Sequence, residues 1–233
     1  MTCGECGGVA RVVRSQLRVS SYECADCVEG KNRERERRYR EQMLMARETW
    51  LKENVEGIMG RLGVLKEHTA ATLKEFESSV ATRALSVLEK PQQFHGLLVT
   101  SPTGVGKTRL LAALARHAIL GDKRVCYCQA RQLLRRIWNT YRDGAGETEE
   151  AVIADFSTCD LLVIDDLAHE GRVSEAGLSA LHEIVSTRNG NYLATLISTN
   201  LTLAEIANHY HPALGSRLGA WLQVVLTGPD RRQ

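Results

Sequence analysis

The sequence lacks the features of an exported or membrane-spanning protein. It does not open on a basic and then an apolar stretch, and no apolar run approaches the roughly 20 residues that cross a bilayer. A strong excess of one charge is also missing, because 30 basic and 28 acidic side chains leave a formal net charge of +2. Composition alone therefore does not indicate nucleic-acid binding, and we expect a cytoplasmic protein.

The composition allows one substantial core. A chain of 233 residues with 43% hydrophobic side chains is long enough for a globular domain and a small appendage. The seven cysteines are an odd number, which argues against a framework of disulfides. Four of them form two C-x-x-C pairs, a pattern that indicates metal ligation in a reducing compartment.

The segment Ser-Pro-Thr-Gly-Val-Gly-Lys-Thr at residues 101–108 predicts a phosphate-binding loop. A strand-like run at residues 96–100 precedes it and a helix-like run at residues 109–116 follows, which is the context such a loop needs. Backbone N–H groups and a helix N-terminus can then bind a triphosphate, while Lys107 neutralises phosphate oxygens and Thr108 ligates Mg²⁺. Ser101 replaces the usual first glycine. The expected nucleotide-binding residues are Pro102, Thr103, Gly104, Val105, Gly106, Lys107 and Thr108.

The two cysteine pairs near the N-terminus predict a zinc ribbon. They are separated by 17 residues, within the spacing typical of such sites. Four thiolate ligands leave no coordination position for water or substrate, so the ion is expected to be structural. Residues 9–13 and 17–19 are expected to form a short hairpin between the pairs. The expected ligands are Cys3, Cys6, Cys24 and Cys27.

Strand-like and helix-like runs alternate after the loop, which predicts a parallel sheet with helices on both faces. Further strands are expected at residues 123–128, 159–166 and 192–199, and a helix at residues 130–141. The remaining cysteines fall in or beside these strands and are expected to be small buried side chains. They are Cys126, Cys128 and Cys159.

Polar residues at the ends of these strands suggest catalytic roles. The apolar run at residues 159–166 ends in two acids, the Walker B arrangement, in which Asp165 would hold Mg²⁺ through water and Asp166 would act as the base. Asn200 follows the next strand and could bind the attacking water or the γ-phosphate. Arg217 could stabilise transferring phosphoryl charge, on a neighbouring subunit.

Two segments rich in basic side chains are candidates for contact with nucleic acid. Residues 31–60 alternate basic and acidic side chains, which favours a solvated helical connector over a DNA-binding arm, and the glycines at residues 57–63 suggest a boundary after it. The helix at residues 130–141 combines arginines with aromatic side chains, as single-strand binders do, although its Leu and Ile residues and Trp138 are spaced for a core. The candidate single-stranded DNA contacts are Arg131, Arg135, Arg136 and Tyr141.

In this order, the motifs resemble the AAA+ ATPases, and more narrowly the DnaC/DnaI-type helicase loaders and their IstB-type transposition relatives. The resemblance runs from about residue 72 to residue 231. It implies that residues 72–76 lie near the adenine, that Asn200 is the sensor 1 residue and that Arg217 is an arginine finger acting in trans. The chain stops soon after Arg217, so no C-terminal helical lid is expected. Asp166 stands where many members have glutamate, which implies slow hydrolysis.

The predicted architecture is α/β: a RecA-like AAA+ P-loop domain at residues 63–233, preceded by a zinc ribbon at residues 1–30 and a helical connector at residues 31–62. The resemblance implies an ATPase that uses ATP and Mg²⁺ and self-associates through Arg217. It would load a hexameric replicative helicase, held by the N-terminal region, onto single-stranded DNA in a bacterium or a phage infection.

Three alternative functions are also compatible with these motifs. The first is an IstB-type ATPase that assembles on duplex DNA and directs a transposase. The second is a zinc-dependent DNA-binding protein whose P-loop domain only senses nucleotide. The third is a small P-loop kinase that phosphorylates a metabolite.

Overall fold

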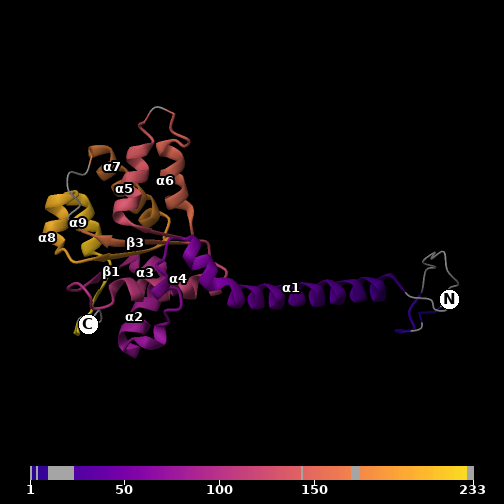
Figure 1. Ribbon diagram of the computed structural model, residues 1–233. Helices are drawn as coiled ribbons and strands as arrows, with labels where there is room; N and C mark the ends of the chain where they lie inside the picture. Colours follow the sequence, from indigo (N-terminus) through magenta and orange to yellow (C-terminus); the bar gives the residue numbers. More distant parts are fainter. Residues whose placement is uncertain (1, 4, 10–23, 143, 169–173, 230–233) are drawn as a thin grey trace. The chain divides into compact units, whose positions relative to one another are not determined.

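The computed structural model describes residues 2–3, 5–9, 24–142, 144–168 and 174–229. The chain divides into two compact units, Met1–Trp50 and Leu51–Gln233. The first holds the cysteine pairs and the second holds the sheet (Figure 1). No helix among the described residues is both long and apolar enough to cross a membrane. The hairpin predicted between the cysteine pairs falls almost entirely outside the described residues.

Helix α1 (Ala25–Arg61) is longer than the connector that the charge pattern predicts. In the first unit, Glu34 pairs with Arg37 and Arg38 at 2.8 Å in both cases, so charges three and four residues apart support an otherwise solvated helix. The glycines at residues 57–63 do not all lie in a turn, as the predicted boundary requires, since Gly57 and Gly60 lie inside α1.

The C-terminal turns of α1 belong to the core of the second unit. Leu51, Val55 and Met59 are buried there, 7%, 1% and 0% exposed. Burying these side chains offsets the poor helix propensity of Gly57 and Gly60 in the same turns of the helix. The chain turns only at Gly63, whose φ of +89° favours a residue without Cβ. The tertiary contact therefore decides where this helix ends.

The second unit is built on a five-stranded parallel sheet of order β2-β3-β4-β1-β5. This parallel α/β sheet confirms the predicted fold class. Successive strands are joined by helices, as a parallel sheet requires. The strands are β1 (Gly96–Thr100), β2 (Val125–Gln129), β3 (Leu161–Leu167), β4 (Ala194–Thr199) and β5 (Leu222–Val225).

Helices cover both faces of the sheet (Figure 1). One face packs against α4 and α2, and the other against α5, α7 and α9. Alternate strand residues go to opposite faces: Val163 joins the first cluster and Ile164 the second. The remaining elements are α2 (Ser78–Glu89), α3 (Pro91–Phe94), α4 (Lys107–Leu120), α5 (Ala130–Asn139), α6 (Glu149–Thr158), α7 (Glu175–Gly190), α8 (Leu203–His209), α9 (Pro212–Gly219) and the 3₁₀ turns Lys66–His68 and Leu73–Glu75.

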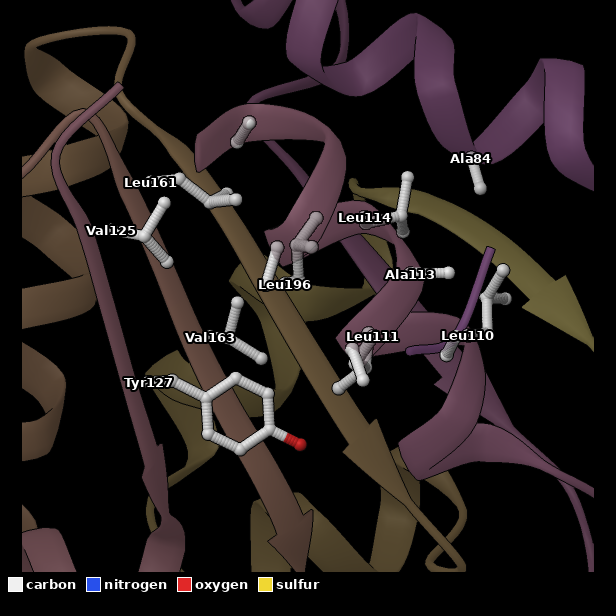
Figure 2. Close-up of a cluster of buried hydrophobic side chains, with 14 of the residues drawn as sticks. Ala84, Leu110, Leu111, Ala113, Leu114, Val125, Tyr127, Leu161, Val163 and Leu196 are labelled. Carbon is white, nitrogen blue, oxygen red and sulfur yellow. The ribbon is translucent and has the colours of Figure 1, made fainter. Parts of the chain in front are cut away.

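The face under α4 is the one that carries polar groups to the edge of the sheet. Figure 2 shows Leu110, Leu111 and Leu114 of α4 packed over strand residues that include Val163 and Tyr127, with the Tyr127 hydroxyl as the polar end of this cluster. Packing α4 this closely holds the loop before it at the carboxyl ends of the strands. The predicted burial of Cys128 and Cys159 is confirmed, while Cys126 is half-buried.

A glycine in β1 is required by the packing of a buried aromatic ring. A Cβ on Gly96 would lie 2.5 Å from the ring of Trp221, whereas a Cβ on the helical Gly60 meets nothing within 4 Å. We expect Gly96→Ala to lower the free energy of unfolding by about 1–3 kcal/mol through overpacking. Gly60→Ala should raise it by up to about 1 kcal/mol because alanine favours the helix. Urea denaturation of both variants measures this, and an unchanged Gly96→Ala stability would contradict the packing argument.

Candidate functional site

The phosphate-binding loop lies between β1 and α4, as its sequence predicts. Gly104 and Gly106 adopt φ values of +84° and +112°, which expose the backbone of the loop without the Cβ clash that other residues would meet. Ser101 does not share this conformation, because its φ is not positive. A serine is therefore compatible with the first loop position.

Lys107 at the start of α4 bends back over the loop. Its Nζ donates hydrogen bonds to the carbonyl oxygens of Ser101 at 2.7 Å and Pro102 at 3.0 Å. These contacts hold the ammonium group at the mouth of the loop, beside the helix N-terminus that a phosphate would approach. The arrangement fits a triphosphate, which needs several donors and a positive charge at one point.

The two acids at the end of β3 have different surroundings. Asp165 is 3% exposed and accepts hydrogen bonds from Thr108 Oγ1 at 3.3 Å, Tyr127 Oη at 3.0 Å and Ser198 Oγ at 2.5 Å. Asp166 is exposed, with a φ of +58°, where the pairing register between β3 and β4 shifts. Thr108 and Asp165 together offer the hard oxygen ligands that Mg²⁺ prefers.

These groups line one cavity of about 770 Å³. Asn200, at the end of β4, lines it together with both acids. The structure thus brings together the loop, Asp165, Asp166 and Asn200, which the sequence analysis selected separately. The lining residues are Gly63, Leu65, Glu67, His68, Thr103, Gly104, Gly106, Lys107, Thr108, Arg109, Tyr127, Gln129, Asp165, Asp166, Ala168, Ser198 and Asn200.

Several lining residues escaped the sequence analysis. The cavity wall before the loop comes from Gly63, Leu65, Glu67 and His68, rather than from residues 72–76. Glu75 of that segment forms an ion pair with Arg109. Arg109 also donates to the carbonyl of Glu67 at 3.2 Å, so the segment supports the wall from behind. A polar residue in an apolar strand was the available signal for Ser198; nothing comparable marks residues 63–68.

Arg217 lies outside the residues that line this cavity. It belongs to α9, and its Nη1 lies 2.6 Å from His182 Nε2 of α7. Burial, followed by the positive charge of Arg217, lowers the pKa of His182, which keeps the imidazole neutral and able to accept. Within one chain, Arg217 is therefore a contact between α7 and α9, and a role in trans stays a prediction.

The arginines of α5 differ in what they contact. Arg136 pairs with Glu147 at 2.8 Å and Asp155 at 3.1 Å, and these contacts raise its pKa. Arg131 and Arg135 are exposed. The Tyr141 hydroxyl donates to Glu149. Leu133, Leu134 and Ile137 are buried, as their spacing predicts.

Trp138 differs from its predicted core position, since it is 47% exposed with the Arg142 guanidinium 4.2 Å above its ring. The side chain thus leaves the apolar face of α5 and forms a cation–π pair at the surface.

The first unit contains one cluster of thiols. The sulfur atoms of the four predicted ligands lie within 4.8 Å of one another, and Cys6 Sγ lies 3.6 Å from Cys24 Sγ. Zinc–sulfur bonds of about 2.3 Å in a tetrahedron place sulfurs about 3.8 Å apart, so the cluster fits zinc. Backbone N–H groups of Cys6, Glu5 and Cys24 lower the pKa of the Cys3 thiol to about 6.

The sequence profile described as "IstB-like ATP binding protein" matches residues 29–216, most of the chain. The chain belongs to the IstB-like ATP-binding protein family. This IstB-like protein is 24% identical over 151 residues to the replicative helicase loader DnaC of Escherichia coli K12, covering 65% of the chain and 54% of that protein.

A second relative is an ATP-binding protein of insertion sequence IS1162 from Pseudomonas fluorescens. It is 31% identical over 108 residues, covering 46% of the chain and 45% of the relative. The chain therefore spans about half the length of each of these two relatives.

Solved structures confirm the AAA+ fold of this IstB-like protein. DnaI matches with a TM-score of 0.59 and 19% identity over 70% of the chain and 94% of that structure. The DnaC helicase loader matches with a TM-score of 0.55 and 22% identity over 70% of the chain and 100% of that structure. Domain III of Thermotoga maritima DnaA matches with a TM-score of 0.59, 20% identity and coverage of 70% and 69%.

Metal binding by the four clustered cysteines can be tested directly. We expect the purified protein to contain stoichiometric zinc, because four thiolates at this spacing form a closed site. Cys27→Ser should lose the metal, while Cys126→Ala, a half-buried thiol in β2, should keep it. Metal analysis, with the absorption spectrum after Co²⁺ replacement, checks both. A zinc-free wild-type protein would contradict the assignment.

Proposed function

We propose that this protein is an ATPase that loads a replicative helicase onto DNA under the control of ATP. The observation that supports the ATP part is the convergence of Lys107, Thr108, Asp165, Asp166 and Asn200 on one cavity. A loop, two acids and a polar residue after the neighbouring strand are the parts that phosphoryl transfer to water needs.

The residues have distinct proposed roles. Lys107 binds the β- and γ-phosphate oxygens. Thr108 and Asp165 would hold Mg²⁺, which would supply positive charge to the phosphate groups. Bound ATP·Mg²⁺ supplies the phosphoryl group to be transferred. Asp166 accepts the proton of the attacking water, and Asn200 orients that water by hydrogen bonding. Asp166 is suited to this task because its side chain is exposed to the cavity while Asp165 is buried.

Two substitutions separate nucleotide binding from hydrolysis. We expect Lys107→Ala to abolish binding of a fluorescent ATP analogue, since it removes the charge at the loop. Asp166→Asn should leave binding intact and lower kcat by roughly 100-fold or more, the usual loss when a general base is removed. Lys123→Ala is the matched control, because Lys123 is exposed before β2 and lies outside the cavity lining. Full ATPase activity in Asp166→Asn would contradict the role of the base.

Self-association is proposed to place Arg217 against a neighbouring subunit's nucleotide. Its guanidinium is half-buried on α9. Among the described residues, its hydrogen-bond partner is the neutral His182 and not a carboxylate, so its charge is not neutralised by that part of the chain. ATP between two subunits would then favour the oligomer, and loss of the γ-phosphate would remove that stabilisation.

DNA contact is proposed on the exposed side of α5. Arg131 and Arg135 carry the charge that binds phosphates, and the Trp138 ring with Arg142 offers a stacking surface for bases. Arg136 and Tyr141 support this surface through their acidic partners Glu147 and Glu149.

The loader role is favoured over a transposition role by the DnaC relatives, whereas the family match and the insertion-sequence relative support the IstB-type alternative. The helicase grip is proposed to lie in the first unit, Met1–Trp50, which combines the thiol cluster with exposed Met43 and Leu44 on α1. In the IstB-type alternative, the same ATPase domain binds duplex DNA and directs a transposase.

Complex formation distinguishes the two roles. We expect the full chain to form a stoichiometric complex with the replicative helicase of its source organism. Native mass spectrometry with and without ATP·Mg²⁺ measures this complex. Removal of residues 1–50 should abolish the complex, and this cut leaves Leu51, Val55 and Met59 in place to fill the core. Unchanged ATP binding by the truncated protein controls for folding. ATP-dependent assembly on duplex DNA without any helicase complex would instead support the transposition role.

A further inference from the structure

The carboxylate of Asp165 is held from three directions by neutral hydroxyl groups. Its Oδ1 accepts from Ser198 at 2.5 Å and Thr108 at 3.3 Å, and its Oδ2 accepts from Tyr127 at 3.0 Å. The donors come from β4, α4 and β2, and β2 and β4 are the neighbours of β3 in the sheet. Buried charge must be compensated, and here hydrogen bonds to the charged form do so.

Neutral donors preserve the charge that a metal site needs. An arginine or lysine in the same position would neutralise the carboxylate and compete with a cation. The hydrogen bonds that described residues make to Asp165 instead come from hydroxyls, which orient both oxygens and leave the negative charge available. The three hydroxyl donors therefore do two things: they satisfy the buried carboxylate, and they leave it able to attract a cation.

Tyr127 performs this task from inside the apolar cluster. Its ring packs with Val163 under α4, and its hydroxyl points out of the cluster toward the end of the sheet (Figure 2). Burial, and then the nearby charge of Asp165, raise the pKa of Tyr127. The phenol therefore stays protonated and donates its one proton to Asp165.

Ser198 links the two acids. Its hydroxyl donates to Asp165 and also accepts from the backbone N–H of Asp166 at 2.8 Å. Asp166 has a φ of +58° at the shift in register between Ile164 and Leu167 of β3. A residue other than glycine rarely adopts this conformation, so it persists only where the surroundings hold it. The hydrogen bond to Ser198 is one such hold, and it directs Asp166 into the cavity.

We propose that Ser198 and Tyr127 are positioning residues of the nucleotide site: Ser198 sets the orientation of both acids, and Tyr127 fixes the second oxygen of Asp165 for the metal. This inference rests on the proposed ATPase function. Loss of the Ser198 hydroxyl removes the hydrogen bond to the backbone turn at Asp166 and leaves Asp165 Oδ1 with the longer contact from Thr108. Loss of the Tyr127 hydroxyl affects Asp165 alone.

The two hydroxyls should therefore give different kinetic signatures. Ser198→Ala should lower kcat at least about tenfold, a loss typical of groups that orient a metal ligand, with KM for ATP within about threefold of wild type. Both Ser198→Ala and Tyr127→Phe should raise, several-fold, the Mg²⁺ concentration that half-saturates binding of a fluorescent ATP analogue. Tyr127→Phe should reduce kcat less than Ser198→Ala at saturating Mg²⁺.

Controls separate positioning from folding. Ser157→Ala removes a buried hydroxyl in α6 that has no hydrogen-bond partner among the described residues. Ser157 does not line the cavity, so this variant should leave both the Mg²⁺ dependence and kcat unchanged. Ser198→Thr keeps the hydroxyl and should recover most of the activity. Tyr127→Phe conserves the packed ring, so it tests the Asp165 contact even where Ser198→Ala unfolds.

Two outcomes would overturn the inference in distinguishable ways. An active wild-type enzyme, with Ser198→Ala or Tyr127→Phe matching it in Mg²⁺ dependence and kcat, would overturn the positioning role alone. A folded wild-type protein that neither binds nor hydrolyses ATP would overturn the proposed function, and with it this inference.

Discussion

The buried charge of Asp165 is the constraint on which the nucleotide end of the fold depends. A carboxylate that is 3% exposed at the centre of a sheet is tolerated only where donors surround it. Those donors exist because β3 lies between β2 and β4, which carry Tyr127 and Ser198 on the same face. Another strand order would leave the charge without these partners. The chemistry of the site therefore requires this order of strands.

A second buried charged residue, Arg188, has a structural role, in contrast to Asp165. Arg188 of α7 is 0% exposed and donates to the carbonyl oxygens of Phe156 and Cys159, at the end of α6, and of Ala194. Burial lowers its pKa. Its remaining oxygen partner among the described residues is the Thr195 hydroxyl, to which Nε donates at 2.9 Å, so this group joins helices to the sheet. Asp165, by contrast, opens onto a cavity.

The two units achieve stability by different means. The sheet unit buries two apolar clusters, one on each face. Among the described residues of the first unit, the buried cluster consists of Cys3 and Cys24 with Cys27 packed against them. Sulfur atoms alone provide little apolar area, so a metal ion is the natural source of folding free energy there.

The sequence by itself determined the parallel α/β fold, the loop at residues 101–108, the two acids at the end of β3 and the thiol cluster, because each depends on local spacing. Tertiary structure alone decided that α1 continues through Gly57, that residues 63–68 form a cavity wall, and that Tyr127 and Ser198 meet Asp165. These outcomes depend on contacts between segments distant in sequence. Periodicity specifies which face of an element is apolar, but only the packed sheet specifies which hydroxyl lies beside which carboxylate.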